Sequence, residues 1–563
     1  MFLPAGFAQT KAPQQTPLNP GTATCEVSGQ VVDAASGQPL RKISLHLYPT
    51  GTQGSTAITV RTNGMVNGPP RSYAARSDAT GQFAFPSLPP GEYRLQGYGN
   101  DYPTQMYGQR DRYGPPKPLK LTPGQNLQNI RFPLEPGVVI TGRVLDEDGD
   151  PVTRAFVSAL REQHFSGRVS YNRLGNAQTD DLGQYRIFAL PAGRYYVGAS
   201  FQMHASSPAS VVYAPEYYPG TTDPSQATAI NAKPGDTESG IDITLTPVEP
   251  ARLSGQVIGG GAGGDLRRPG PFVFLLPSNS AGPYAALGLV AQSTVRDVQG
   301  DFEIDNVPPG SYRLVAQSFA RRGRTGALIA ELPVELASGQ NLSGLQLTLT
   351  PGVAVSGTVT ADPSPGFDLG SVVVRLISDS QNPLGGRPGG RVSRDGKFVL
   401  QNVYPGKYQL SVTPLAAPYY LKSATFNGAD ALDSGLTVPA GMTSGTLAIS
   451  LGLDGGTLTG SVTGQDNKSA VDASVVLIPD PPRRDRDDLY KVTHTNAMGM
   501  FSLEGIAPGT YKVFSWENVE NEEYKDPDFM KQYEDQGQSV EVKQNSQQSV
   551  QLQVIPQTAA PAD

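Results

Sequence analysis

The sequence predicts an all-β protein of five tandem antiparallel β-sandwich modules joined in a rod, with few short helices. Three observations support this prediction: a phrase that recurs five times, an opening phrase before each copy, and an alternating apolar strand after it. Short strands separated by frequent turn residues are typical of β-sandwiches. Each predicted module has six or seven such strands in roughly 100 residues.

Each module opens with a hydroxyl residue, a Gly and a Val two positions later. The openers are SGQV at 28–31, TGRV at 141–144, SGQV at 254–257, SGTV at 356–359 and TGSV at 459–462. A second apolar strand follows, such as the alternation of Ile43, Leu45 and Leu47. Side chains alternate between the two faces of a strand, so His46 is expected on the solvent face.

The recurring phrase consists of a turn, a short strand, Pro-Gly or its equivalent, and a Tyr. In the first copy Phe83 and Phe85 alternate with small or polar residues, and Gly91 precedes Tyr93. Gly tolerates positive φ, and Pro-Gly suits the centre of a type II turn, so the phrase predicts a β-hairpin. The two glycines are ten residues apart in all five copies, whose first glycines are Gly81, Gly183, Gly300, Gly396 and Gly499.

A closing strand ends each module, as in the alternation of Ile130, Phe132 and Leu134. Few residues separate a closing strand from the next opener, and such short joints limit hinge motion. The predicted divisions are a signal-peptide remnant and flexible leader at 1–21, sandwiches at 22–137, 138–250, 251–352, 353–455 and 456–556, and a tail at 557–563.

Composition excludes several classes of protein. The chain has 563 residues, one Cys and four His, which rules out a disulfide framework and a Cys-based metal site and leaves little room for His-based catalysis. The net charge of −7 argues against a nucleic-acid partner. No apolar run approaches the ~18 residues of a transmembrane segment. We find no catalytic set and no cofactor motif, so the sequence predicts a protein that is not an enzyme and carries no cofactor.

The repeats resemble the carboxypeptidase regulatory-like domain. The resemblance rests on the opener G-x-V-x-D with its following G-x-P, as in Gly29, Val31, Asp33, Gly37 and Pro39, and on the phrase D-x-x-G-x-F…L-P-x-G-x-Y. It covers about residues 22–556, although the G-x-P turn is degraded in the last three copies. The resemblance implies an Ig/transthyretin-like sandwich that is classed with carbohydrate-binding-like folds. It also implies an exported bacterial protein.

Aromatic clusters follow the recurring phrase in several modules. Flat rings stack on sugars and anchor protein partners, but they also cover the ends of sandwich cores, and the sequence leaves both interpretations open. The candidate ligand-binding residues are Tyr102, Tyr107, Tyr113, Tyr217, Tyr218, Trp516, Tyr524, Phe529 and Tyr533.

Two acidic features have alternative interpretations. Asp146, Asp148 and Asp150 form either an ordinary turn or a weak calcium site, because calcium prefers oxygen ligands. The segment Glu517–Gln536 has eight acids and two lysines. It is either a solvated cap with a short helix that begins after Asp526, or a docking site.

The start MFLPAGF has too few residues for a signal peptide, which predicts a truncated one with cleavage after Ala8. We therefore expect an extracytoplasmic protein, in the periplasm, at the cell surface or secreted. The predicted function is that of a non-catalytic binding or spacer protein whose partner is a carbohydrate or cell-envelope polymer. The alternative is a scaffold that docks an envelope protein through the acidic fifth module.

Overall fold

A computed structural model describes residues 24–50, 72–109, 116–165, 168–201, 212–259, 271–278, 291–295, 299–318, 327–362, 367–378, 388–415, 417–517, 519 and 522–556. The chain divides into two compact units, Met1–Gly137 and Val138–Asp563. The predicted leader at 1–21 and the tail at 557–563 lie outside the described residues.

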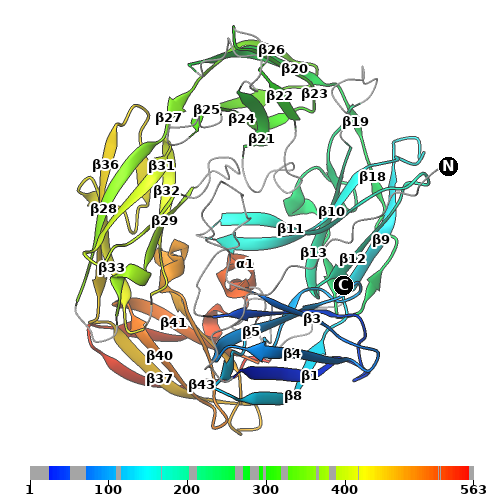
Figure 1. The fold of residues 1–563 in the computed structure, drawn as a ribbon. Coiled ribbons are helices and arrows are strands. Elements are labelled where there is room, and N and C mark those ends of the chain that lie inside the picture. Colours follow the sequence, from blue (N-terminus) through cyan, green and yellow to red (C-terminus); the bar gives the residue numbers. More distant parts are fainter. Residues whose placement is uncertain are drawn as a thin grey trace, which may run out of the picture. The chain divides into compact units, whose positions relative to one another are not determined.

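The first unit contains two sheets, seen in blue in Figure 1. One has the order β4-β1-β8, with β1 (Cys25–Asp33), β4 (Gln82–Leu88) and β8 (Asn126–Leu134). The other has the order β3-β2-β5-β6, and β7 also pairs with β5; its strands are β2 (Ser44–Pro49), β3 (Tyr73–Arg76), β5 (Gly91–Tyr98), β6 (Gln105–Met106) and β7 (Leu119–Leu121).

The second unit begins with the sheet β12-β9-β17, to which β18 adds, and the sheet β11-β10-β13-β15, to which β16 adds. A small pair, β14-β19, accompanies them. The elements are β9 (Val138–Leu145), β10 (Phe156–Phe165), β11 (Arg168–Gln178), β12 (Gln184–Leu190), β13 (Gly193–Ser200), β14 (Val212–Tyr213), β15 (Glu216–Tyr217), η1 (Pro224–Gln226), β16 (Ile230–Ala232), β17 (Thr237–Glu238), β18 (Ile243–Thr244) and β19 (Pro247–Val248).

The next sheets of this unit have the orders β23-β20-β26 and β22-β21-β24-β25-β27. Their strands are β20 (Ala251–Ile258), β21 (Phe272–Pro277), β22 (Ala291–Thr294), β23 (Asp301–Val307), β24 (Gly310–Ser318), β25 (Leu328–Leu336), β26 (Asn341–Thr348) and β27 (Thr350–Pro351).

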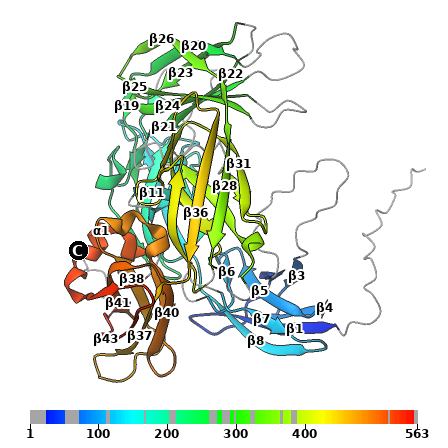
Figure 2. The ribbon, with the colours of Figure 1, turned by 90° about the vertical axis from the view of Figure 1, so that its left-hand side faces the viewer.

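They are followed by the sheets β31-β28-β36-β33-β34 and β30-β29-β32-β35. Figure 2 shows β31, β28 and β36 side by side. The elements are β28 (Val353–Ala361), η2 (Leu369–Ser371), β29 (Val373–Ser378), β30 (Gly389–Arg391), β31 (Lys397–Val403), β32 (Gly406–Thr413), β33 (Tyr420–Phe426), β34 (Ala429–Asp430), β35 (Leu436–Val438) and β36 (Ser444–Gly452).

The last sheets are β40-β37-β43 and β39-β38-β41-β42. The elements are β37 (Gly456–Thr463), β38 (Ser474–Pro479), η3 (Arg483–Asp485), η4 (Asp487–Leu489), β39 (Lys491–His494), β40 (Met500–Ile506), β41 (Gly509–Trp516), η5 (Glu523–Lys525), α1 (Pro527–Lys531), η6 (Glu534–Gln536), β42 (Gln538–Val542) and β43 (Gln547–Gln553). Within the described residues, no helix is long and apolar enough to cross a membrane.

The predicted all-β class is confirmed, and the sheets come in facing pairs. In the first unit the inward residues of both sheets, such as Leu45, Leu95 and Phe132, form one buried cluster. The opening strand pairs antiparallel with β4 and parallel with β8, and the same arrangement recurs at β9, β20, β28 and β37. The division into five modules at the predicted boundaries stays a prediction.

The predicted β-hairpin is wrong. β4 pairs with β1 in one sheet, whereas β5 pairs with β2 in the other, so the recurring phrase crosses from sheet to sheet. Ser87, near the end of β4, has a φ of 60°, and the pairing of β4 with β1 shifts register there. The alternation in each strand directs apolar side chains toward the shared core in both topologies, so the pattern alone did not distinguish them.

The opener glycine is explained by the parallel pairing. A Cβ at Gly29 would lie 2.1 Å from the carbonyl oxygen of Ile130 on β8, and a Cβ at Gly142 would lie 2.1 Å from that of Ile241. A Cβ at Gly460 would lie 2.4 Å from the carbonyl oxygen of Val550 on β43. Only Gly therefore allows the opening and closing strands to approach this closely.

Candidate functional site

An aromatic cluster joins the segment 522–536 to the sheet that carries Trp516. Trp516 is 2 % exposed, and it packs with Tyr524, Tyr533 and the half-buried Phe529 over the outward residues of β38 and β41. The ring centroid of Trp516 lies 5.8 Å from that of Tyr533. Figure 2 shows α1 close to β38 and β41. These four rings therefore form a small second core on the outer face of the sheet.

The short helix in this segment begins as the sequence predicts. Asp526 is the N-cap residue of α1, and its Oδ1 accepts a hydrogen bond from the backbone N–H of Asp528 at 2.7 Å. Pro527 occupies the first helical position, where its missing N–H costs no hydrogen bond. The cap fixes the Asp526 carboxylate at the edge of the segment.

The other candidate aromatic residues that the structure describes also contact packed regions. Tyr217 is fully buried beside Leu160, and Tyr218 packs against the neighbouring core. The hydroxyl of Tyr102 donates to Asp33 Oδ2 at 2.9 Å, and Tyr107 packs against the core of the first unit. Tyr113 lies outside the described residues. Ligand binding by these residues stays a prediction.

A different aromatic group is exposed in the first unit. Tyr48 on β2 and Tyr98 on β5 are 37 % and 39 % exposed, and His46 lies between them. The His46 ring is nearly parallel to that of Tyr98, at 4° and 5.8 Å between centroids, and to that of Tyr48, at 21° and 6.1 Å. We call these three residues the aromatic face. Its row of rings lies opposite the buried Leu45 and Leu47, as alternation predicts.

Polar groups border the aromatic face. The hydroxyl of Tyr48 donates to Gln96 Oε1 at 3.0 Å, and the exposed Arg94 pairs with Tyr48 across the strands. Burial raises the pKa of Tyr48, and the nearby Tyr98 raises it further, so this hydroxyl stays protonated at neutral pH. The face therefore combines ring surfaces with neutral hydroxyl and amide groups and one cation.

The sheets equivalent to that of β2 and β5 are those of β10–β13, β21–β24, β29–β32 and β38–β41, and their outer faces are mostly covered or polar. Leu160 and Tyr196 on the β10–β13 sheet lie in a buried cluster, as do Leu276 and Val315 on the β21–β24 sheet. Trp516 and its neighbours cover the β38–β41 sheet. The β29–β32 sheet instead carries polar residues, such as Arg375 paired with Ser411. Phe156, at the start of β10, is also exposed (40 %), but it stands apart from other exposed rings. The sheet of the first unit, which exposes two tyrosines stacked on one histidine, is therefore the ligand-binding candidate among the described sheets of this kind.

The predicted calcium residues form an ordered turn. Asp146 Oδ1 accepts hydrogen bonds from the backbone N–H groups of Asp148 at 3.1 Å and Asp150 at 2.8 Å. Gly149 has a φ of 84°, which suits the turn. These two hydrogen bonds satisfy Oδ1 of Asp146 from within the turn itself. Calcium binding at this turn stays a prediction.

Several acids of the segment 522–536 are paired within the chain. Glu534 lies 2.8 Å from Arg484 and 2.9 Å from Lys512, and burial, which would raise its pKa, is outweighed by these two cations, which lower it. Asp528 pairs with Lys531, and Glu522 with Lys525. Docking through this acidic surface stays a prediction.

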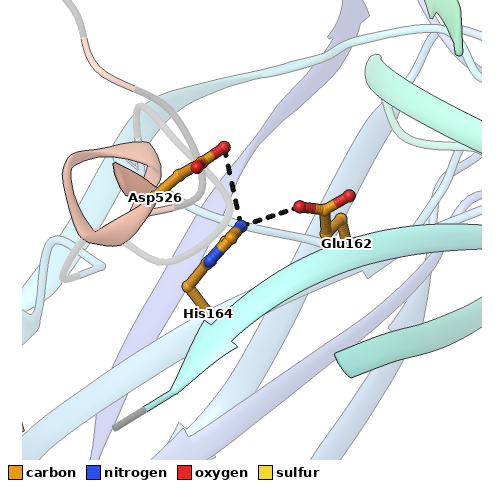
Figure 3. A group of neighbouring side chains, drawn as sticks. All are labelled: Glu162, His164 and Asp526. Atoms are coloured by element: carbon orange, nitrogen blue, oxygen red, sulfur yellow. Dashed lines mark hydrogen bonds and ion pairs between the residues drawn. The ribbon is translucent and has the colours of Figure 1, made fainter. Parts of the chain in front are cut away.

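One group among the described residues has the composition of a metal site: Glu162 and His164 on β10, and Asp526 (Figure 3). His164 Nε2 lies 2.8 Å from Glu162 Oε1 and 3.5 Å from Asp526 Oδ2. Burial alone would lower the pKa of His164, but the hydrogen bond to Glu162 and the charge of Asp526 outweigh it and raise the pKa. No sequence pattern pointed to this group, because His164 and Asp526 are 362 positions apart in the chain.

Comparison with protein families adds one match. Residues 139–246 match the carboxypeptidase regulatory-like domain. The match begins within β9 and ends beyond β18, so this regulatory-like domain holds the opening strand, the recurring phrase and the closing strand. No curated protein matches the chain.

Some solved structures show a distant likeness. A minor pilin of Streptococcus agalactiae is 13 % identical, covers 40 % of this chain and 97 % of its own, and has a TM-score of 0.23. A shaft pilin of Lactobacillus rhamnosus GG is 10 % identical over 40 % of this chain and 98 % of its own, with a TM-score of 0.20. The major pilin subunit of Bacillus cereus is 10 % identical over 57 % and 99 %, with a TM-score of 0.13. Scores this low carry no argument about function.

Proposed function

We propose that this chain is a non-catalytic, extracytoplasmic protein that binds a carbohydrate or cell-envelope polymer through the aromatic face of its first unit. The observation that carries the proposal is the row of Tyr48, His46 and Tyr98, whose two tyrosines are exposed and whose rings stack along one sheet face. The regulatory-like domain at 139–246 is consistent with this proposal but names no ligand.

The chemistry of sugars favours such a face. A pyranose ring presents C–H groups on its flat sides, and these pack against the π surface of an aromatic ring. Its hydroxyl groups point outward around the edge, where Gln96 and the Tyr48 hydroxyl can exchange hydrogen bonds with them. A row of rings suits a chain of sugar units better than one sugar, so the proposed ligand is a polysaccharide.

The test is a panel of immobilised polysaccharides, including cell-wall polymers, against the full chain. Tyr98→Ala and Tyr48→Ala should each weaken retention by the bound polymer about tenfold, or ~1.4 kcal/mol. Phe188→Ala is the matched control, since Phe188 is an exposed aromatic residue (51 %) on β12 in the second unit. Equal retention of all variants, or no retention across the panel, would overturn the proposal.

Protein docking through the acidic segment is the second candidate. It is favoured by the packed base of the segment, which holds residues 522–536 against β38 and β41. Such docking should weaken as salt rises, because charge contacts at a surface are screened. Neutralising Glu520, Glu522 and Glu523 should weaken it too. Stacking on the aromatic face should resist moderate salt, and this difference separates the two candidates.

A further inference from the structure

We propose that Glu162, His164 and Asp526 form a binding site for one divalent transition-metal ion of the zinc type, which joins β10 to the segment 522–536. The proposal goes beyond polymer binding and does not depend on it. It rests on the convergence of three ligand side chains from two distant parts of the second unit.

The ligand atoms converge on one point. Figure 3 shows the ring of His164 directed between the two carboxylates, and Nε2 is the atom nearest to both. The three ligand atoms all lie within 4.8 Å of one another. Zinc bonds of about 2.0–2.2 Å in tetrahedral geometry place ligand atoms roughly 3.3 Å apart. Small side-chain adjustments would therefore bring Nε2 and the two oxygens to bonding distance of one ion.

The ligand types select the kind of metal. One imidazole nitrogen and two carboxylate oxygens suit zinc and its neighbours among the transition metals. Calcium takes six to eight oxygen ligands, and magnesium usually keeps several waters, so neither is favoured by an imidazole with two carboxylates. Two carboxylates also balance the charge of a divalent ion beside a neutral imidazole. Three protein ligands leave a fourth position for water.

Each carboxylate is held by a further contact. Asp526 Oδ1 accepts the N-cap hydrogen bond from Asp528, which directs Oδ2 to His164. The hydroxyls of Tyr196 and Tyr171 lie near the Glu162 carboxylate and interact with it electrostatically. Such contacts around a metal site fix the orientation of its ligands and typically change metal affinity by about 10–100-fold when removed.

The site is shielded but accessible. The side chains of His164, Asp526 and Glu162 are 11 %, 19 % and 25 % exposed. An ion can therefore enter from solvent while the surrounding protein limits competition from water. A bound ion would link β10 with the N-cap of α1, where the direct contact is a 3.5 Å ion pair.

The test is calorimetric titration of the full chain, purified without a histidine tag, with Zn²⁺. We expect one ion per chain, and a loss of affinity of about tenfold or more in His164→Gln and Asp526→Asn. Asp528→Asn is the matched control, because Asp528 is a neighbouring, exposed carboxylate that pairs with Lys531. Titration with Co²⁺ gives a second readout, since a tetrahedral site with mixed ligands yields visible absorption bands.

Two outcomes would overturn the proposal. One is Zn²⁺ binding that is as strong in Asp526→Asn and His164→Gln as in the wild type. The other is no binding by the folded wild-type chain. Circular dichroism checks that each variant keeps its β content. If His164→Gln does not fold, Asp526→Asn decides alone, since Asn also serves as an N-cap.

Discussion

The hydroxyl of Tyr511 donates a hydrogen bond to the backbone carbonyl of Ala507 at 2.8 Å, inside the protein. The Tyr of the recurring phrase makes the same contact four residues back at the other positions: Tyr93 to Pro89, Tyr195 to Pro191, Tyr312 to Pro308 and Tyr408 to Tyr404. The contact holds the crossing between the sheets, and it explains why the phrase has Tyr rather than Phe.

Tyr511→Phe should therefore destabilise the surrounding sheets. The substitution leaves the carbonyl of Ala507 buried without this donor, at an expected loss of about 1–2 kcal/mol. Trp516 is the single Trp of the chain and lies on the same strand, so its fluorescence reports the local transition during urea denaturation. Tyr98→Phe, at an exposed site in the other unit, should leave this transition unchanged.

Gly460→Ala should be more disruptive than its small size suggests. The added Cβ would lie 2.4 Å from the Val550 carbonyl and 2.6 Å from the ring of Phe501, so β37 and β43 must separate. We expect a loss of about 1–3 kcal/mol, as for other overpacked sites, again read from Trp516 fluorescence. Gly464→Ala, directly after β37, is the control, because its Cβ would meet only the side chain of Asp466 at 3.0 Å and no backbone atom closer than 3.7 Å. An equal or smaller loss in Gly460→Ala would contradict the close-approach explanation.

Glu216→Gln should stabilise the second unit at neutral pH. Burial raises the pKa of Glu216, partly offset by the side chain of Thr246, so the folded state binds its proton more tightly than the unfolded state. The corresponding stability is present below the unfolded pKa and is lost as pH rises through the folded pKa. Gln keeps the shape of the side chain without its charge.

Calorimetry should accordingly show a higher unfolding temperature for Glu216→Gln than for the wild type at about pH 7, and a smaller difference at about pH 4. Glu147→Gln, at an exposed position, is the control and should show little difference at either pH. A stabilisation by Glu216→Gln that grows as the pH falls would contradict the assignment.

The sequence predicted the repeated strands but not the partners of every strand. Phe85 and Tyr93 both face the core, yet they belong to different sheets, because alternation records which face is buried and not which strand is adjacent. The parallel pairing of β1 with β8 was hidden for the same reason.

The sequence carried a signal for the burial of Trp516, in the neighbouring strand on which Trp516 packs. All six residues of Ser474–Pro479 are buried, and this run lacks the polar alternation of a half-exposed strand. In contrast, residues Ser44–Pro49 alternate, which predicts an uncovered outer face. The contact between His164 and Asp526 had no such signal, since a string of modules predicts contacts between neighbours only.

Polymer binding by the aromatic face is tested most directly by the affinity of the full chain for the polysaccharide that the panel identifies, measured for the wild type and for Tyr98→Ala. If the aromatic face binds the polymer, moderate salt should leave the affinity nearly unchanged, Tyr98→Ala should weaken it about tenfold, and Phe188→Ala should not alter it. Binding that salt abolishes, or that Tyr98→Ala leaves intact, would contradict the assignment of the aromatic face as the binding surface.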